Sequence, residues 1–288
     1  MKLFYHSWHS GNSGHSLEQG KDSTSLTPNF PKLVLLHGLG GTGNLWRPIA
    51  AGLENQMAVL APDQRGHGKS RVPQSHAGDV YYTPEAFGQD LIDTLSAIDF
   101  HPTWGVGHSM GVRSLTAAAH LRPEYFQGLI LVDLGLSGLA GGGLGVNLSQ
   151  FLKLLPPQFA SREKARAFMT AHCPDPSIGQ YLLAVATKHA DGSVEFPFDH
   201  EALLQTLDSA RNFNIRDWIL DLGRGGMPIR LLRGQKSLVW RKEEFDHERE
   251  AFRNIPNVEF HEIPNAGHGL PFEQRALFVE FVRKNVLG

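Results

Sequence analysis

Short apolar runs recur along the chain and are separated by longer segments with helical spacing of their apolar residues. Such runs are typical of strands that are buried on both faces of a parallel sheet. The pattern therefore predicts a doubly wound α/β architecture. Strands are expected at residues 33–36, 58–61, 104–106, 129–132, 229–232 and 258–263. Helices are expected at residues 44–54, 84–98, 110–121, 242–254 and 271–286.

The alternation of strands and helices stops within residues 135–226. This region opens with the glycine-rich residues 135–145, a composition suited to a hinge, and continues with helical patterns. Open α/β sheets bind ligands beyond the carboxyl ends of their strands, so helices inserted there would shape a pocket. We expect an α/β core formed by residues 1–134 and 227–288 and a helical cap formed by residues 135–226. A separate helical domain with no role in the site is the alternative.

Composition narrows the classes of function. The 288-residue chain is 41% apolar and has a formal net charge of −2, which gives no reason to expect nucleic acid or a charged membrane as partner. Cys173 is the only cysteine, and no zinc-binding histidine motif occurs, so we expect no disulfide and no metal. No apolar stretch has the length of a signal peptide or a membrane span. We expect a cytoplasmic protein that does not insert into membranes, with residues 9–29 as a polar loop; the oligomeric state stays open.

The strongest chemical signal lies where the strand 104–106 meets the helix 110–121. Gly107-His108-Ser109-Met110-Gly111 has the G-x-S-x-G form of a nucleophile elbow. In this tight turn both glycine positions must lack side chains, and the serine hydroxyl projects from the sheet edge. The helix amino terminus behind it favours developing negative charge. Ser109 is therefore the candidate nucleophile, and it needs a neighbouring base.

The candidate base is His268, in the loop between the last expected strand and the last expected helix. Enzymes with this elbow place the histidine last in the chain order of their catalytic residues. His261 lies within the strand pattern and is expected to be structural. The backbone N–H groups of Leu39, in the loop after the first strand, and of Met110 are the expected oxyanion donors, each contributing about 3 kcal/mol.

Two glycine-rich segments match other motifs in form only. Gly38, Gly40 and Gly43, with Asp63 further on, fit the dinucleotide-binding fingerprint. That function would leave the serine turn and the histidine loop unexplained. Residues 65–70 end like a phosphate-binding loop, but Asp63 stands where that motif requires its first glycine. We therefore expect no nucleotide cofactor.

Taken in order, these segments resemble the α/β-hydrolases of the esterase/lipase type. The resemblance rests on HGLGG (37–41), DQRGHGKS (63–70), GHSMG (107–111), LVDLG (131–135) and NAGHG (265–269). It implies the α/β-hydrolase fold, with a mostly parallel doubly wound sheet and an inserted helical cap. It also implies a cofactor-free Ser–His–acid mechanism. The segment DQRGHGKS (63–70) usually has a structural role in this family.

The triad acid departs from the commonest family pattern. Many members carry aspartate after the penultimate strand, where residues 233–238, RGQKSL, hold no carboxylate. The resemblance to YbfF-type bacterial esterases, which carry serine at that site, implies that Asp133 is the acid. On this view we expect substitution of Ser237 to have little effect. The rival carboxylates lie in a predicted helix: Glu243, Glu244 and Asp246.

Apolar residues of the expected cap favour an uncharged acyl group. We expect short-to-medium carboxylic esters or thioesters as small-molecule substrates. The expected substrate contacts are His108, Phe151, Leu155, Phe159 and Tyr181. The same scaffold supports C–C bond hydrolases and menaquinone-synthase-like lyases, and Arg113 after the serine turn also occurs in the lyase pattern. A small-molecule-sensing signalling protein is the non-enzymatic alternative.

Overall fold

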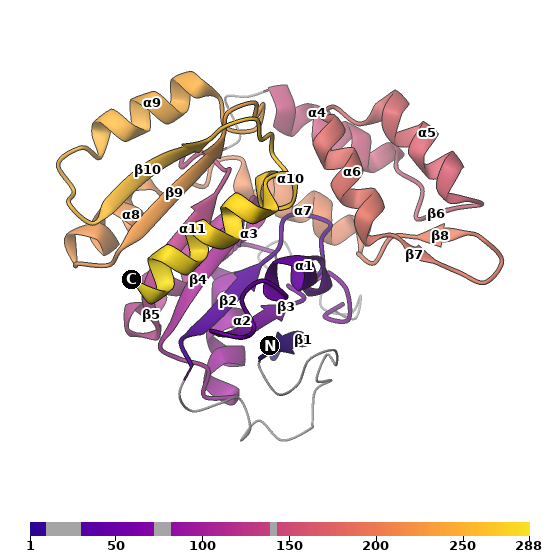
Figure 1. The fold of residues 1–288 in the computed structure, drawn as a ribbon. Coiled ribbons are helices and arrows are strands. Elements are labelled where there is room, and N and C mark those ends of the chain that lie inside the picture. Colours follow the sequence, from indigo (N-terminus) through magenta and orange to yellow (C-terminus); the bar gives the residue numbers. More distant parts are fainter. Residues whose placement is uncertain (10–29, 72–81, 139–142) are drawn as a thin grey trace.

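The computed structural model describes residues 1–9, 30–71, 82–138 and 143–288. Its main sheet contains β1 (Tyr5–Trp8), β2 (Lys32–Leu36), β3 (Ala58–Pro62), β4 (Thr103–His108), β5 (Phe126–Val132), β9 (Ile229–Gly234) and β10 (Val258–Ile263). The spatial order is β1-β3-β2-β4-β5-β9-β10 (Figure 1). Only β1 runs antiparallel to its neighbour, so the sheet is the mostly parallel one that the apolar pattern predicts. The expected loop 9–29 lies outside the described residues except for His9.

Helices cover both faces of this sheet, as Figure 1 shows. One face is covered by α2 (Pro84–Ala97), α3 (Met110–Leu121), α8 (Arg216–Arg224) and α9 (Lys242–Ala251). The other face is covered by α1 (Arg47–Ala50), α10 (Leu270–Glu273) and α11 (Arg275–Leu287). Single 3₁₀ turns are η2 (Gly43–Trp46) and η4 (Pro123–Tyr125). Side chains such as Leu115 on the first face and Phe278 on the second are fully buried, and each contributes about 1.5–3 kcal/mol to folding.

Two of the expected helices differ in detail. The segment 44–54 forms only η2 and the one-turn helix α1. The segment 271–286 is divided at Gln274 into α10 and α11.

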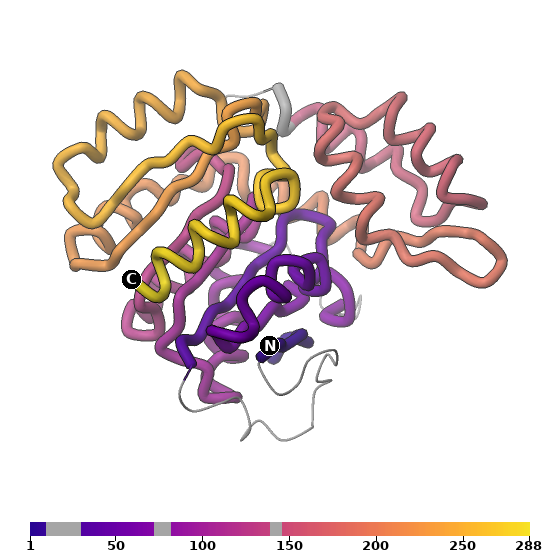
Figure 2. Tube along the Cα trace, viewed as in Figure 1, coloured from indigo at the N-terminus to yellow at the C-terminus, as the bar shows by residue number. Residues whose placement is uncertain are grey.

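The cap has its own helices and a small sheet. The elements are α4 (Gly143–Leu154), β6 (Gln158–Phe159), α5 (Arg162–His172), α6 (Pro176–Val185), β7 (Thr187–Lys188), β8 (Val194–Glu195) and α7 (His200–Ala210). Three of the helices begin at Ser161, Asp175 and Asp199, whose side chains accept hydrogen bonds from backbone N–H groups of the first turn. Figure 2 shows that α4, α5 and α6 project to one side of the core.

One boundary of the expected cap needs adjustment. Helix α8 lies within the range 135–226, but its side chains Ile219 and Leu222 belong to the core cluster on the sheet face. The segments that enter and leave the cap lie side by side, because a Cβ on Gly138 would come 2.2 Å from the carbonyl oxygen of Arg211. We therefore propose that the cap ends near Ala210 and that α8 is part of the core.

Candidate active site

The candidate residues converge on one edge of the sheet, although they are far apart in the sequence. Each follows the carboxyl end of a parallel strand, and such ends meet at the same edge. The pairs are Leu39 after β2, Ser109 after β4, Asp133 after β5, Ser237 after β9 and His268 after β10.

Ser109 occupies a sharp turn between β4 and α3. Its φ of 54° and ψ of −121° lie in a strained region that costs about 1–3 kcal/mol. A Cβ on Gly107 would lie 2.4 Å from the carbonyl oxygen of Gly111, and one on Gly111 would lie 2.7 Å from that of Leu36. Both glycines are therefore required by backbone contacts, as the elbow motif predicts.

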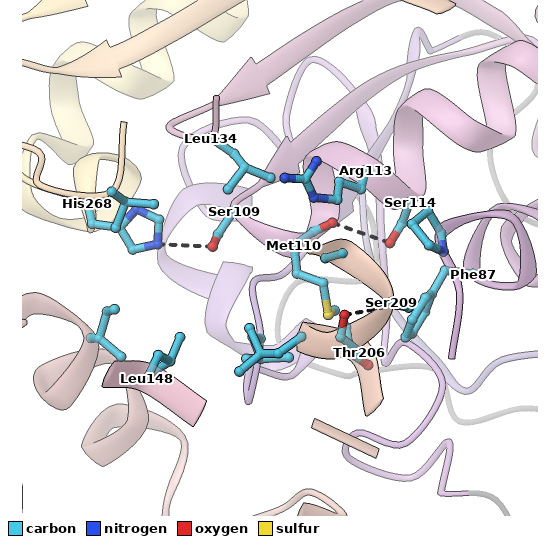
Figure 3. A pocket seen from close by; sticks show the side chains of 16 residues that line it. Phe87, Ser109, Met110, Arg113, Ser114, Leu134, Leu148, Thr206, Ser209 and His268 are labelled. Atoms are coloured by element: carbon cyan, nitrogen blue, oxygen red, sulfur yellow. Dashed lines mark hydrogen bonds between the residues drawn. The ribbon is translucent and has the colours of Figure 1, made fainter. Parts of the chain in front are cut away.

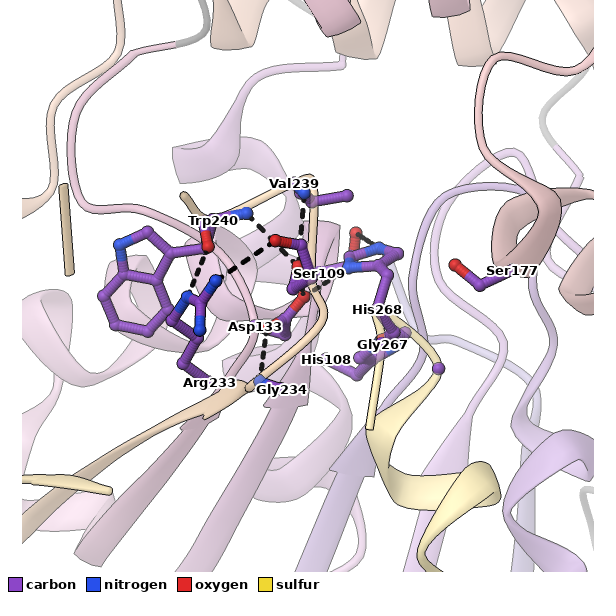
Figure 4. Close-up of polar contacts among 12 residues, drawn as sticks. His108, Ser109, Asp133, Ser177, Arg233, Gly234, Val239, Trp240, Gly267 and His268 are labelled. Carbon is purple, nitrogen blue, oxygen red and sulfur yellow. Dashed lines mark hydrogen bonds and ion pairs between the residues drawn. The ribbon is translucent and has the colours of Figure 1, made fainter. Parts of the chain in front are cut away.

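A continuous hydrogen-bond chain joins the three residues expected to form the triad. The Ser109 hydroxyl lies 3.0 Å from Nε2 of His268, and Nδ1 of His268 lies 2.8 Å from Oδ2 of Asp133 (Figure 4). The carboxylate is fully buried, and its Oδ1 accepts a 2.8 Å hydrogen bond from the Gly234 N–H. With Nδ1–H donating to Asp133, Nε2 is free to accept the serine proton.

The rival carboxylates do not take part in this chain. Glu244 and Asp246 form surface ion pairs with Arg241 and Lys242 on α9, and Glu243 is exposed on the same helix.

Ser237 contacts the carboxylate of Asp133, a contact that was not predicted from the sequence. Its hydroxyl donates to Oδ2 of Asp133 at 2.5 Å and accepts the Val239 and Trp240 N–H groups at 3.2 and 3.3 Å. Arg233 holds the same loop by donating to the carbonyl oxygen of Trp240. The expectation that Ser237 is unimportant is therefore revised. The sequence feature that could have indicated this contact is a serine at the position where many family members carry the acid. A serine side chain is small enough to leave room for Asp133, and its hydroxyl still reaches the carboxylate.

The loop after β2 leaves one N–H group free beside the nucleophile. The Gly38 N–H donates to the Tyr181 hydroxyl at 2.9 Å, and the Gly40 N–H donates to Nε2 of His67 at 3.0 Å. Within the described part of the chain, the N–H of Leu39 between them has no acceptor. Burial lowers the pKa of His67 to about 4, so this ring is neutral and can accept the Gly40 hydrogen bond.

Met110 supplies a second N–H at the start of α3. Among the described residues it also has no acceptor, since it opens the helix. The helix dipole adds partial positive charge at this end. Leu39 and Met110, whose N–H groups have no acceptor among the described residues, line the same cavity as Ser109.

His108 fixes the histidine loop from below. Its Nε2–H donates to the carbonyl oxygen of His268 at 2.7 Å. Burial, with the neighbouring His268 as a smaller cause, lowers the pKa of His108 to about 3, so the ring stays neutral. His108 also borders a cavity beside Ser109, where Tyr181 from the cap faces it.

Two cavities meet at Ser109 and His268. The larger has an empty volume of about 680 Å³, and the smaller one of about 410 Å³. Figure 3 shows the larger cavity. Its walls are mostly apolar and include Leu39, Phe87, Met110, Leu134, Leu148 and Leu207. The smaller cavity lies under the cap and is bordered by Gly38, His108, Leu152, Tyr181, Leu182 and Leu203.

The substrate contacts expected from the sequence are only partly located at these cavities. His108 and Tyr181 border the smaller one. Phe151, Leu155 and Phe159 instead lie in the apolar core of the cap and line neither cavity. The rings of Phe151 and Phe159 pack against Phe168 at centroid distances of 6.2 and 5.3 Å, so both rings contribute to the apolar core of the cap.

Arg113 borders the larger cavity and also holds the hinge of the cap. Its buried guanidinium donates to the carbonyl oxygens of Ser137 and Phe213 at 3.0 and 3.3 Å. These residues lie on the segments that enter and leave the cap. Glu248 is nearby and accepts the Leu136 N–H at 3.0 Å, and burial raises the pKa of this carboxyl to about 7. Arg113 is thus engaged by the hinge backbone.

The remaining sequence motifs have structural roles. Asp63 accepts the Gly43 and Lys69 N–H groups at 2.7 and 2.8 Å, and Arg65 pairs with Asp90. The glycine-rich segments are therefore occupied by internal contacts. No group of three or more potential metal ligands occurs in the described ranges. The same ranges hold no helix that is both long and apolar enough to cross a membrane.

The elbow, the hydrogen-bond chain and the sheet order define a class of protein. Residues 33–281 match the model of the alpha/beta hydrolase family, and the chain belongs to that family. It is 27% identical to the sn-1-specific diacylglycerol lipase ABHD11 of Mus musculus, over 88% of this chain and 80% of that protein. It is 24% identical to a putative esterase/lipase of Haemophilus influenzae, over 90% of this chain and 84% of that protein.

Other similarities agree on the fold and the broad class. The esterase YbfF of Escherichia coli is 27% identical over 54% of this chain and 59% of its own length. A marine microorganism esterase has a TM-score of 0.75 at 19% identity, covering 99% of both chains. An E-2-(acetamidomethylene)succinate hydrolase has a TM-score of 0.74 at 19% identity, covering 89% of this chain and 91% of its own. Family and relatives together support a hydrolase of the esterase type.

Proposed function

We propose that the protein is a serine hydrolase that cleaves carboxylic esters through an acyl-enzyme. The observation that carries this proposal is the chain Asp133–His268–Ser109, with its serine at the junction of two cavities. His268 takes the Ser109 proton as the hydroxyl oxygen attacks the ester carbonyl. Asp133 holds the imidazole in the tautomer that accepts this proton and stabilises its charged form. The alcohol then leaves with a proton from His268, and water releases the acid by the reverse sequence.

The free N–H groups of Leu39 and Met110 donate hydrogen bonds to the carbonyl oxygen and stabilise the negative charge that develops on it. Each such donor contributes about 3 kcal/mol to transition-state stabilisation. Because both donors are backbone groups, changes of these two side chains alone should have small effects on the hole itself.

The walls of the cavities favour uncharged substrates. The larger cavity is lined mainly by Leu, Met and Phe side chains, which stabilise an alkyl chain, and Arg113 is the one charged arginine or lysine among the described residues that border it. We place the acyl chain in this cavity and the leaving alcohol toward the smaller one. Short-to-medium acyl esters, or thioesters of the same acids, are the proposed substrates.

The contacts of Arg113 favour ester cleavage over lyase chemistry. Arg113 borders the larger cavity, but two of its N–H groups donate to backbone carbonyl oxygens of the cap hinge, and these contacts already give the side chain a structural role.

The test is hydrolysis of p-nitrophenyl esters over a series of acyl lengths, with wild type beside Ser109→Ala. We expect wild-type turnover and loss of at least about 10³-fold in the variant. Folded wild-type protein without turnover would contradict the proposal and favour a lyase or a ligand sensor. Activity that survives in Ser109→Ala would place the nucleophile elsewhere.

A further inference from the structure

Tyr181 is the cap side chain that bonds to the oxyanion loop. Its hydroxyl accepts the Gly38 N–H at 2.9 Å and donates to the Gly38 carbonyl oxygen at 3.2 Å. One hydroxyl thus contacts both backbone groups of the residue that precedes Leu39, and it shares the carbonyl oxygen with the Gly41 N–H at 3.0 Å and with Nδ1 of His37 at 2.8 Å. Burial raises the pKa of Tyr181 well above its ordinary value, so the hydroxyl keeps the proton that it donates.

The glycines of this loop make room for the hydroxyl. A Cβ on Gly41 would lie 2.0 Å from the Tyr181 oxygen, and one on Gly38 would lie 3.4 Å from the same atom. A Cβ on Gly38 would also lie 3.1 Å from Cβ of Ser109. The loop therefore closes around the Tyr181 hydroxyl on one side while it contacts the nucleophile on the other.

The cap helix that carries Tyr181 touches the loop at a second point. Leu182 packs so closely on Gly40 that a Cβ there would lie 2.5 Å from its Cδ2. Gly38 and Gly40 are the neighbours of Leu39 on either side, so α6 contacts the loop both before and after the residue with the free N–H.

We propose that Tyr181 is a positioning residue for the oxyanion hole, through which the seating of the cap sets the direction of the Leu39 N–H. This inference rests on the proposed esterase function and adds a regulatory element to it. Displacement of the cap would remove the acceptor of the Gly38 N–H and one of three hydrogen bonds to the Gly38 carbonyl oxygen, which would leave the Leu39 N–H less firmly oriented. Tyr181 does not touch the reacting atoms in this role, and it acts through the backbone.

The experiment compares wild type with Tyr181→Phe, which keeps the ring and removes the hydroxyl. We expect kcat for a p-nitrophenyl ester to fall about tenfold with KM changed less than twofold, because one hydrogen-bonded restraint is lost. A trifluoromethyl ketone of matched acyl length forms a tetrahedral adduct whose oxygen occupies the hole. Its Ki should rise by the same factor as kcat/KM falls.

The matched control is Leu183→Ala on the same helix. Leu183 is buried in the cap core and lines neither of the two cavities at Ser109. We expect this variant to lower the melting temperature while kcat and the inhibitor Ki stay within twofold of wild type. Tyr181→Phe with wild-type kcat and Ki would overturn the inference, as would equal losses in both variants, since these would reflect cap stability alone. Wild-type protein that hydrolyses no ester would instead contradict the proposed function on which the inference rests.

Discussion

Replacement of Ser237 by alanine tests the hydrogen bonds around the acid. The Asp133 carboxylate receives hydrogen bonds from the Gly234 N–H, from Nδ1–H of His268 and from the Ser237 hydroxyl. The variant removes the last of these and leaves the carboxylate buried. It also removes the acceptor for the N–H groups of Val239 and Trp240.

The size of the effect follows from these contacts. A hydrogen bond to a charged group contributes about 1.5–3 kcal/mol, and a buried N–H left without a partner costs about 1–3 kcal/mol. These hydrogen bonds exist only in the folded state, so we expect their loss to lower the free energy of unfolding by about 2 kcal/mol. Freed of one restraint, Asp133 orients His268 less well. We expect the activation barrier to rise by about 1–2 kcal/mol, which lowers kcat/KM about 5- to 30-fold.

The assay is ester hydrolysis combined with urea unfolding, with Ser7→Ala as control. Ser7 is equally buried in β1, away from the site, and its hydroxyl has no partner among the described residues. The control should keep wild-type kcat/KM. Ser237→Ala with wild-type kcat/KM and reduced stability would show that the serine only holds its loop. Wild-type values in both measurements would refute the reasoning.

Three further outcomes are expected. Asp133→Asn should lower kcat about 10⁴-fold with unchanged circular dichroism, and adding Ser237→Asp should restore part of it; wild-type activity in the single variant would exclude Asp133 as the acid. Ala210→Trp, in the wall of the larger cavity, should lower kcat/KM for octanoate esters more than tenfold and leave acetate within twofold; an unchanged length profile would place the acyl chain elsewhere. For His67 alone, the unfolding free energy measured in urea should fall by roughly 1.6 kcal/mol between pH 6.5 and pH 5. The folded pKa of about 4 lies below the ordinary 6.5, so the unfolded chain binds the proton first. His67→Gln should flatten that slope, and an equally steep slope in the variant would assign it to other groups.

Local chemistry explains which parts of the fold were predictable. The central strands are continuous apolar runs because both faces are covered, and the elbow needs its two glycines for backbone clearance. Strand β1 escaped prediction because it is an antiparallel edge strand of mixed polarity. Its Ser7 and Trp8 pair with Leu60 and Val59 of β3, and Trp8 packs in the apolar cluster on one face of the sheet, contacts that no local pattern predicts.

The cap side chains show the limit of pattern reasoning. Phe151 and Leu155 are as apolar as Leu148 and Leu152, and all four lie on α4 or at its end. Only Leu148 and Leu152 face the cavities, because the docking of α4 on the core decides which face of the helix meets Ser109. The role of Ser237 likewise depends on a tertiary contact, its hydrogen bond to Asp133 after another strand, which the local sequence does not show.

The strand that ends in Asp133 continues directly into the hinge of the cap. Four residues after Asp133, the carbonyl oxygen of Ser137 accepts a hydrogen bond from Arg113, which lies on α3, the helix that follows the serine turn. The cap is therefore not an interchangeable module that can be exchanged at its two junctions. A chimera that replaces the cap between Ser137 and Phe213 must keep the backbone path from Asp133 to Ser137 and the two carbonyl oxygens that accept hydrogen bonds from Arg113. Otherwise, exchanging the cap would also displace Asp133.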